Sequence, residues 1–338
     1  MASHLRQHMP AKPHKWGMKL FVLCDSYGFS YAFELYSGAG DNKVPSGVPD
    51  LGAASNVVSR LSQIIPDHKQ HILYFDNYYT AIPLMIYLYS RGIFSLGTIR
   101  TNRIANCKLS TDKQVQKEKR GYSEEYVASC HGVDISTTLW KDNKCVRLAS
   151  TYVGMKQFIK DNETEVEQKI ARYDRVQKKR IEVDCPTIIR EYNAHMGGVD
   201  LMDGLIGRYR IKMKTNKWTN RIFFHLIDMA MVNAYLLHRR INETYPKELK
   251  PQLPSFRKEV AAILCKHLRE DITKKSVGRP RASPSPQVVK KLPKKTYLPT
   301  DDTRLDAFDH WPEWLDRSGL LGPDGPVIVQ AKILLQQL

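Results

Sequence analysis

The sequence lacks the patterns that mark disulfide-stabilised, zinc-binding, secreted and membrane-spanning proteins. Its six cysteines are scattered, with no CxxC pair and no His/Cys cluster at zinc spacing. We therefore expect reduced thiols in an intracellular protein. The N-terminus has no apolar signal segment. The most apolar long stretch, 222–237, is broken by His225, Asp228 and Asn233, so it is too short and too polar to span a bilayer.

Acidic residues are scarce relative to basic ones. The chain has 35 acidic and 52 basic residues, which gives a formal net charge of +17. Lysine and arginine that neutralise phosphates release counterions and gain affinity, so this excess favours a polyanionic partner. The alternative is a basic protein whose charges serve only solubility.

The length and the hydrophobic pattern predict an α/β fold. A chain of 338 residues, 42% of them hydrophobic, can bury one large core or two ordinary ones. Its first part alternates short apolar runs with segments of helical spacing, and the order strand, strand, helix, strand, helix, strand indicates a mixed sheet. The expected strands are 16–25, 28–36, 72–75 and 94–99, and the expected helices are 48–65 and 81–90.

The character of the chain changes three times after the first core segment, 10–105. Residues 106–185 contain short β-like runs and a hairpin turn at 141–144, which predicts a mainly β insertion. Residues 186–245 return to helical patterns and complete the core. Residues 246–338 are basic and rich in proline and serine around 278–287, so we expect a largely flexible tail without a zinc domain.

Four aspartates suggest a metal site. Asp25 and Asp76 each end a short apolar run, and a carboxylate at such a strand end needs compensation. If the two strands are neighbours, both carboxylates emerge at one edge of the sheet. Asp200 and Asp203 are three residues apart and share a face on a helix. Oxygen ligands without thiolates or imidazoles favour Mg²⁺ or Mn²⁺, and two such ions about 4 Å apart would activate a nucleophile at a phosphodiester.

Each carboxylate also has a simpler interpretation. An aspartate at a strand end is often a turn residue that accepts backbone N–H bonds, which applies to Asp25 and Asp76. Asp200 can cap the helix that follows it. Both interpretations remain open at this point.

The stretch 208–218 carries five cations and no acidic residue directly after the last aspartates. A phosphate backbone that enters a metal site needs such a lining, and aromatic residues nearby can stack on bases. The alternative is a solvated basic face with the tryptophan packed on the protein. The candidate DNA-binding residues are Arg100, Arg103, Arg208, Arg210, Lys212, Lys214, Lys217 and Trp218.

Several motifs, in this order along 10–245, resemble those of the piggyBac family of cut-and-paste transposases and its transposable-element-derived relatives. They are KPHKWGMKLFVLCDS, YFDNYYTAIPL, GTIRTNR, LWKDNKCVRLAS, CPTIIREYNAHMGGVDLMD and KWTNRIFFHLIDMAMVNAYLLHR.

The resemblance implies an RNase H-like fold with a DDE/D active site. Asp25, Asp76 and Asp200 would be the metal ligands, with Asp203 as the further carboxylate of this family. The implied chemistry is hydrolysis of DNA at transposon ends and strand transfer into TTAA targets. A nuclear protein, with a possible homodimer, follows from the same resemblance.

The chain departs from the family at both ends. Only about fifteen residues precede the first catalytic strand, and no cysteine-rich zinc domain follows the last motif. These departures favour two alternatives to an active transposase: a domesticated nuclear DNA-binding protein without catalysis, or an incomplete copy.

Overall fold

The structure, a computed structural model, describes residues 5–8, 16–38, 42–155, 169–174, 177–215, 217–242, 251–270 and 328–334. The chain divides into two compact units, one of residues 1–258 and 326–338 and one of residues 259–325. The four-part division expected from the sequence stays a prediction. Of the helices in the described ranges, none is both long and apolar enough to cross a membrane.

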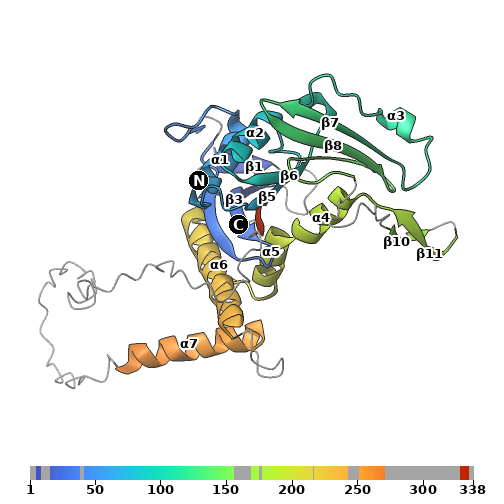
Figure 1. Ribbon diagram of the computed structural model, residues 1–338. Coiled ribbons are helices and arrows are strands. Elements are labelled where there is room, and N and C mark those ends of the chain that lie inside the picture. The colour runs from blue at the N-terminus through green and yellow to red at the C-terminus, as the bar shows by residue number, and fades with distance from the viewer. Residues whose placement is uncertain are drawn as a thin grey trace, which may run out of the picture. The chain divides into compact units, whose positions relative to one another are not determined.

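One mixed sheet of eight strands forms the core of the first unit, which confirms the expected α/β class (Figure 1). The strand order is β4-β3-β12-β5-β6-β9-β8-β7. The pairs β12–β5 and β5–β6 are parallel, and the other pairs are antiparallel. The strands are β3 (Leu20–Asp25), β4 (Ser30–Leu35), β5 (Ile72–Phe75), β6 (Phe94–Thr98), β7 (Ser123–Cys130), β8 (Val133–Lys141), β9 (Cys145–Ser150) and β12 (Ile328–Leu334).

Strands β3 and β5 are buried along their whole length, as their continuous apolar runs predict. Side chains alternate between the two faces of the sheet. Leu73 and Phe75 pack on one face with the helices α1 (Ala53–Leu61) and α2 (Ile82–Ser90). Tyr74 packs on the other face with α4 (Thr187–His195). The helix α5 (Gly198–Arg208) lies on the α4 side, where Met202 contacts the Cys24 thiol of β3.

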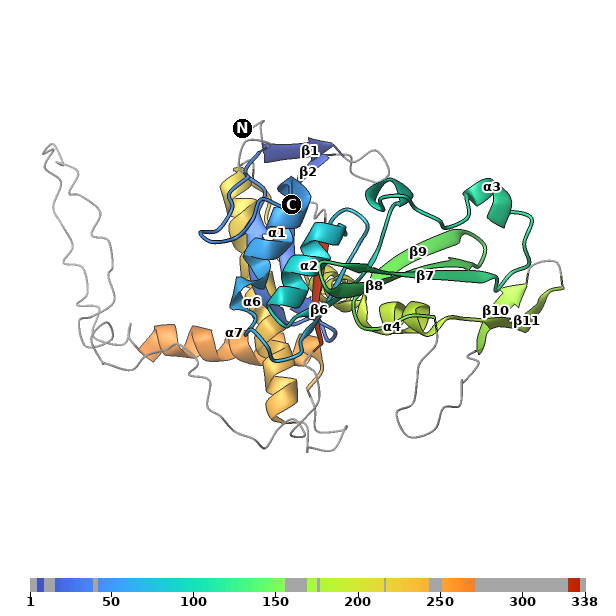
Figure 2. The ribbon, with the colours of Figure 1, turned by 45° about the horizontal axis from the view of Figure 1, so that its top comes forward.

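The C-terminal strand β12, red in Figures 1 and 2, lies between β3 and β5. It is antiparallel to β3 and parallel to β5. Strands β3 and β5 therefore run in opposite directions and are not neighbours. The expectation that they lie side by side, and that Asp25 and Asp76 emerge at one edge, is wrong, because a third strand separates them and their carboxyl ends point to opposite edges.

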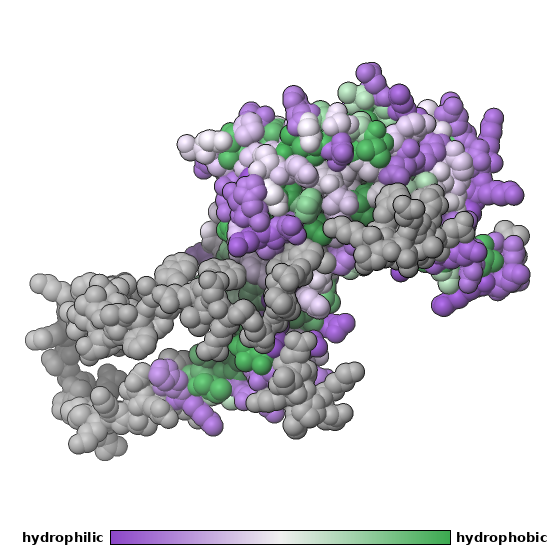
Figure 3. All heavy atoms as spheres, in the orientation of Figure 1, coloured by the Kyte–Doolittle hydropathy of each residue, from purple (hydrophilic) through white to green (hydrophobic). Residues whose placement is uncertain are grey.

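The β-rich middle of the chain extends this sheet and adds a separate hairpin. Strands β7, β8 and β9 continue the sheet beyond β6, and the expected turn at 141–144 joins β8 to β9. Hydrophilic side chains gather over this outer part of the molecule (Figure 3). Outside the large sheet, the structure describes the pairs β1 (Arg6–His8) with β2 (Trp16–Met18) and β10 (Lys169–Asp174) with β11 (Lys179–Asp184), the short helix α3 (Asp112–Val115), and the 3₁₀ turns Ser62–Ile64 and Thr101–Arg103.

The long helix α6 (Trp218–Ile241) is joined to the sheet at the first residue of β4. The Asn233 side chain accepts the Ser30 N–H at 2.9 Å and donates to the Ser30 carbonyl at 2.7 Å. The helix α7 (Leu253–Glu270) follows, and with β12 it lies inside the stretch expected to be a flexible tail. The low-complexity segment 278–287 lies outside the described residues.

Candidate functional site

Asp25 closes a tight turn between β3 and β4. Its Oδ1 atom accepts the backbone N–H groups of Tyr27 and Phe29, both at 2.9 Å, and its Oδ2 atom lies 3.3 Å from the Tyr31 hydroxyl. Gly28 in this turn has a φ of 90°. An added Cβ there would lie 3.1 Å from the Met202 backbone nitrogen, so the turn fits closely against α5.

The Asp25 carboxylate is also paired with the Arg240 guanidinium of α6. That guanidinium lies over the rings of Tyr27 and Phe29, with centroids at 5.8 and 5.2 Å. A carboxylate with these partners has its charge and its oxygens satisfied by the protein. The turn-residue interpretation of Asp25 accounts for its bonds to the Tyr27 and Phe29 N–H groups, and the pair with Arg240 adds a link to α6.

Asp76 lies at the opposite edge of the sheet, after β5. Its Oδ1 atom accepts the Tyr78 N–H at 2.8 Å, and its backbone carbonyl accepts the Thr80 hydroxyl at 2.8 Å. Lys19, before the first residue of β3, is close to Asp76. Burial lowers the pKa of Lys19, and the nearby Asp76 carboxylate partly opposes this.

Asp76 and Asp200 both lie near enough to Tyr192 to affect its ionisation. Burial raises the pKa of Tyr192 to about 12, a hydrogen bond with Thr98 lowers it, and the charges of Asp76 and Asp200 raise it further. Asp200 is in the first turn of α5, where a carboxylate is favoured by the helix dipole.

Asp203, one turn further along α5, lies near the Cys24 thiol of β3. Burial raises the pKa of the Cys24 thiol, and the Asp203 carboxylate adds to that shift. The structure thus places Asp76 and Asp200 near the same tyrosine and Asp203 near Cys24, and it holds Asp25 in its own turn.

A metal centre remains a prediction for this chain. DDE transposases generally use divalent metal ions, and such a site needs several oxygen ligands around each ion. Across the described ranges, no three Asp, Glu, His or Cys side chains come together as a metal site.

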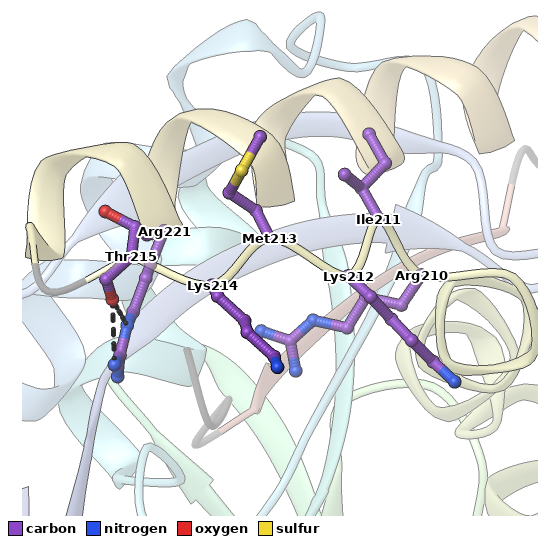
Figure 4. Close-up of a pocket in the computed structure, with 7 residues that line it drawn as sticks. All are labelled: Arg210, Ile211, Lys212, Met213, Lys214, Thr215 and Arg221. Carbon is purple, nitrogen blue, oxygen red and sulfur yellow. Dashed lines mark hydrogen bonds between the residues drawn. The ribbon is translucent and has the colours of Figure 1, made fainter.

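The basic segment, which we define as residues 208–221, lines an open pocket of about 670 Å³. Figure 4 shows the side chains of Arg210, Lys212 and Lys214 on one side of the extended backbone and those of Ile211 and Met213 on the other. The lining residues are Arg210, Ile211, Lys212, Met213, Lys214, Thr215 and Arg221. Cations on one side of an extended chain make a surface that suits a row of phosphates.

Two contacts with α6 hold the basic segment in place. The Ile211 N–H donates to Asp228 at 3.0 Å, and Arg221 donates to the Thr215 carbonyl at 3.1 and 3.2 Å. Asp228 is buried and also accepts two bonds from Arg257 of α7, at 3.1 and 3.2 Å. The buried carboxylate is thus the anchor of the segment.

Arg221, Asp228 and Arg257 were not among the residues expected from the sequence. Arg221 follows Lys217 by four residues, so helical spacing from the start of α6 could have identified it. No sequence signal distinguishes Asp228 from an exposed helical aspartate, because its pairing with Arg257 is long-range.

The remaining predicted DNA-binding residues differ in exposure. Arg208 and Lys217 are exposed, and Trp218 is half-buried at the start of α6. Arg100 is exposed and lies 3.4 Å from the Asn77 side chain. Arg103 is half-buried and donates to two backbone carbonyls, those of Tyr78 and Thr80, at 3.0 and 2.8 Å, so it supports the loop after Asp76.

Comparisons with known proteins agree with the motifs. A family profile described as "Transposase IS4" matches residues 3–235. The human protein "PiggyBac transposable element-derived protein 2" is 28% identical over 304 residues, which cover 89% of this chain and 45% of that protein. The human "PiggyBac transposable element-derived protein 3" is 27% identical over 240 residues, 70% of this chain and 38% of that protein.

A solved structure shares the fold. The cryo-EM structure of a piggyBac transposase synaptic complex with hairpin DNA matches with a TM-score of 0.57 and 21% identity, over 81% of this chain and 52% of that one. The chain spans less than half the length of these two human relatives. The profile match covers more than half of the chain, and the chain therefore belongs to the piggyBac transposase family.

Proposed function

We propose that this chain binds DNA through the basic segment and, as folded here, does not cleave it. The observation that supports this proposal is the side-by-side projection of Arg210, Lys212 and Lys214 in the pocket of Figure 4. Because the backbone of the segment is already held in place, its cations lose less conformational entropy when they contact a row of phosphates. A nuclear location fits the same proposal.

The separation of the carboxylates favours binding over catalysis. Phosphodiester hydrolysis by two metal ions needs ligands that meet at one place, and Asp25 is held in a turn by Arg240. Within the proposal, Asp25 therefore does not act as a ligand for Mg²⁺ or Mn²⁺, and any such role is left to Asp76, Asp200 or Asp203.

The proposed core is RNase H-like. The antiparallel pair β4–β3 lies beside the parallel strands β12, β5 and β6, in that order. Helices cover both faces of this part of the sheet. A homodimer and TTAA-like targets remain expectations from the family.

The test is the salt dependence of DNA binding. We would compare Lys212→Gln/Lys214→Gln with Lys179→Gln/Arg180→Gln, a control that removes two exposed cations from β11. Fluorescence anisotropy on a duplex of about 20 base pairs would be measured at several salt concentrations, with and without a TTAA site. Each phosphate contact contributes about 0.9 to the slope of log K against log salt, so the first pair should lower the slope by about 1.8 and the control should leave it unchanged.

Equal slopes for both double variants would show that overall charge, not the basic segment, drives binding. Cleavage of the same duplex with Mg²⁺ or Mn²⁺ should not exceed that of Asp76→Ala. Cleavage that depends on Asp76 would overturn the non-catalytic part of the proposal and leave the binding part intact.

A further inference from the structure

Helix α6 is apolar on two opposite sides. Its buried residues lie along one side and are His225, Asp228, Met229, Val232, Tyr235 and Leu236. A second set of apolar residues, which we call the outer stripe, consists of Phe223, Ile227, Ala230, Ala234, Leu237 and Ile241. At about 100° per residue, all six lie within about 40° of one line along the helix, and the buried set lies opposite that line.

The outer stripe is the exposed side of α6. Phe223 is 59% exposed, Leu237 47% and Ile241 70%. The two alanines are also exposed, and Ile227 is half-buried. Single exposed apolar residues are normal on a protein surface, but six in one line along about 27 Å of helix make a continuous patch. A helix that is apolar on both sides is expected to be buried on both sides.

The spacing of the outer stripe is that of a coiled coil. Its six positions, from 223 to 241, are separated alternately by four and three residues. Apolar residues at this spacing form the seam along which two helices pack side by side. The stripe therefore predicts a second helix as its partner.

The stripe matches itself when a second copy runs in the opposite direction, because its six positions are symmetric about position 232. The facing positions are then 223 with 241, 227 with 237, and 230 with 234. Large side chains meet large ones at both ends, and the alanines meet at the centre, where small residues let two helix axes come close. A patch that fits itself about a two-fold axis is what a symmetric dimer requires.

The charges of α6 also permit this pairing, although the chain carries a formal net charge of +17. The outer stripe contains no charged residue. Arg221 and Arg239 lie on the opposite half of the helix circumference, and Arg240 is paired with Asp25. Two copies can thus meet along the stripe without bringing like charges together at the seam.

We propose that the outer stripe of α6 is the interface of a homodimer in which the two α6 helices pack antiparallel. The surface is identified from the residues of α6 alone. Such a dimer does not depend on DNA binding by the basic segment, and its tests use protein free of nucleic acid.

The first experiment measures the oligomeric state of the full chain. Sedimentation velocity at high salt, over about 1 to 100 µM, should show a dimer whose population rises with concentration. Leu237→Glu places two unpaired charges in the interface, so its dissociation constant should rise at least about thirtyfold. Val127→Glu is the matched control, because Val127 is 63% exposed on β7, away from the stripe, and should leave the constant unchanged. A monomer at every concentration, or a dimer equally strong in both variants, would overturn the proposal.

The second experiment tests the antiparallel direction by cross-linking. Position 227 of one copy faces position 237 of the other, so a mixture of Ile227→Cys and Leu237→Cys chains should form a disulfide between these positions. Oxidised glutathione serves as the oxidant, and peptide mass spectrometry identifies the link. Neither variant alone should link at its new cysteine, because the two copies of one position lie about 15 Å apart along the helix axis. Links formed by each variant alone would indicate a parallel pair and overturn the antiparallel arrangement.

A charge pair tests the facing positions and guards against loss of folding. Ile227→Lys/Leu237→Glu brings opposite charges together between copies, so it should dimerise at least about tenfold more tightly than Leu237→Glu. Within one helix the two residues lie about 15 Å apart and gain little from each other. A folded double variant no tighter than Leu237→Glu would overturn the facing of 227 and 237. If circular dichroism shows that Leu237→Glu does not fold, Ile241→Glu at the exposed end of the stripe takes its place, and an unchanged dimer in that variant would overturn the proposal equally.

Discussion

Asp25 and Asp76 look alike in the sequence and differ in the structure. Each follows a short buried strand and precedes a polar residue. Asp25 is 5% exposed and bound by a turn and by Arg240. Asp76 lies at the opposite edge, near Lys19 and Tyr192.

The difference teaches that the role of a strand-end carboxylate depends on what lies beside its strand. Helix α6 brings a cation to Asp25, so that carboxylate stabilises the fold. Asp76 instead lies near Lys19 and near Tyr192 of α4, whose ionisation Asp200 of α5 also affects. Strands β3 and β5 are both buried along their whole length, so the burial of the strand does not distinguish the two aspartates.

The largest expected effect separates the two aspartates by stability. Asp25→Ala should lower the free energy of unfolding by about 3 kcal/mol, because this carboxylate accepts two backbone N–H bonds and pairs with a partly exposed arginine, and hydrogen bonds to charged groups are worth about 1.5 to 3 kcal/mol. Asp76→Ala should cost less, about 1 kcal/mol, because the bond of its carboxylate to the Tyr78 N–H is exposed to solvent. Urea unfolding followed by circular dichroism measures both. Similar losses for the two variants would erase the distinction.

Acid should weaken the α6 side of the molecule. Burial lowers the pKa of His225 to about 4 from its usual 6.5, and Arg210 adds to the effect. The folded pKa is the lower one, so this stability is present above pH 6.5 and is lost as pH falls towards 4. The shift corresponds to about 3 kcal/mol. The loss between about pH 7 and pH 4, measured by urea unfolding, should be smaller in His225→Phe, and equal losses would contradict the assignment.

A third buried carboxylate extends the comparison. Asp228→Asn keeps an acceptor for the Ile211 N–H but removes the charge that faces Arg257. We expect a loss of about 2 kcal/mol in unfolding free energy, since hydrogen bonds to charged groups are worth about 1.5 to 3. DNA affinity should fall as well, because the basic segment loses its anchor. Unchanged affinity in a destabilised variant would show that the segment binds without that anchor.

The smallest effect concerns the arginines beside Asp76. Arg103→Ala should cost about 1 kcal/mol, because two backbone carbonyls lose a donor. Arg100→Ala should cost less than about 0.5 kcal/mol, since Arg100 is exposed. Thermal melts of both variants at one pH provide the measurement. The reverse order would place the structural support at Arg100.

The sequence predicts the elements well where patterns are local. The strand expected at 72–75 matches β5, and the helix expected at 81–90 matches α2 within one residue. The hydrophobic periodicity that predicts these elements lies within their own residues, so it can be read from the local sequence.

Long-range pairing could not be predicted in the same way. The pattern of β3 and β5 indicates burial but not which strand lies between them, so the approach of Asp25 to Asp76 was inferred wrongly. The Asp25–Arg240 pair joins residues 215 positions apart. Of the candidate site, the fold places Asp76 and Asp200 near the same tyrosine, and the cations of 210–214 lie on one side of an extended segment because they alternate along it.

The amide of Asn233 has a consequence for how copies of this protein can meet. Strand β4 is one border of the large sheet, and border strands attract further strands from other molecules. Asn233 donates to and accepts from the first residue of β4, as a neighbouring strand would. The Asn233 side chain thus makes the two hydrogen bonds that a backbone peptide group would make at this end of β4. A strand from another molecule could pair there only after α6 had moved away.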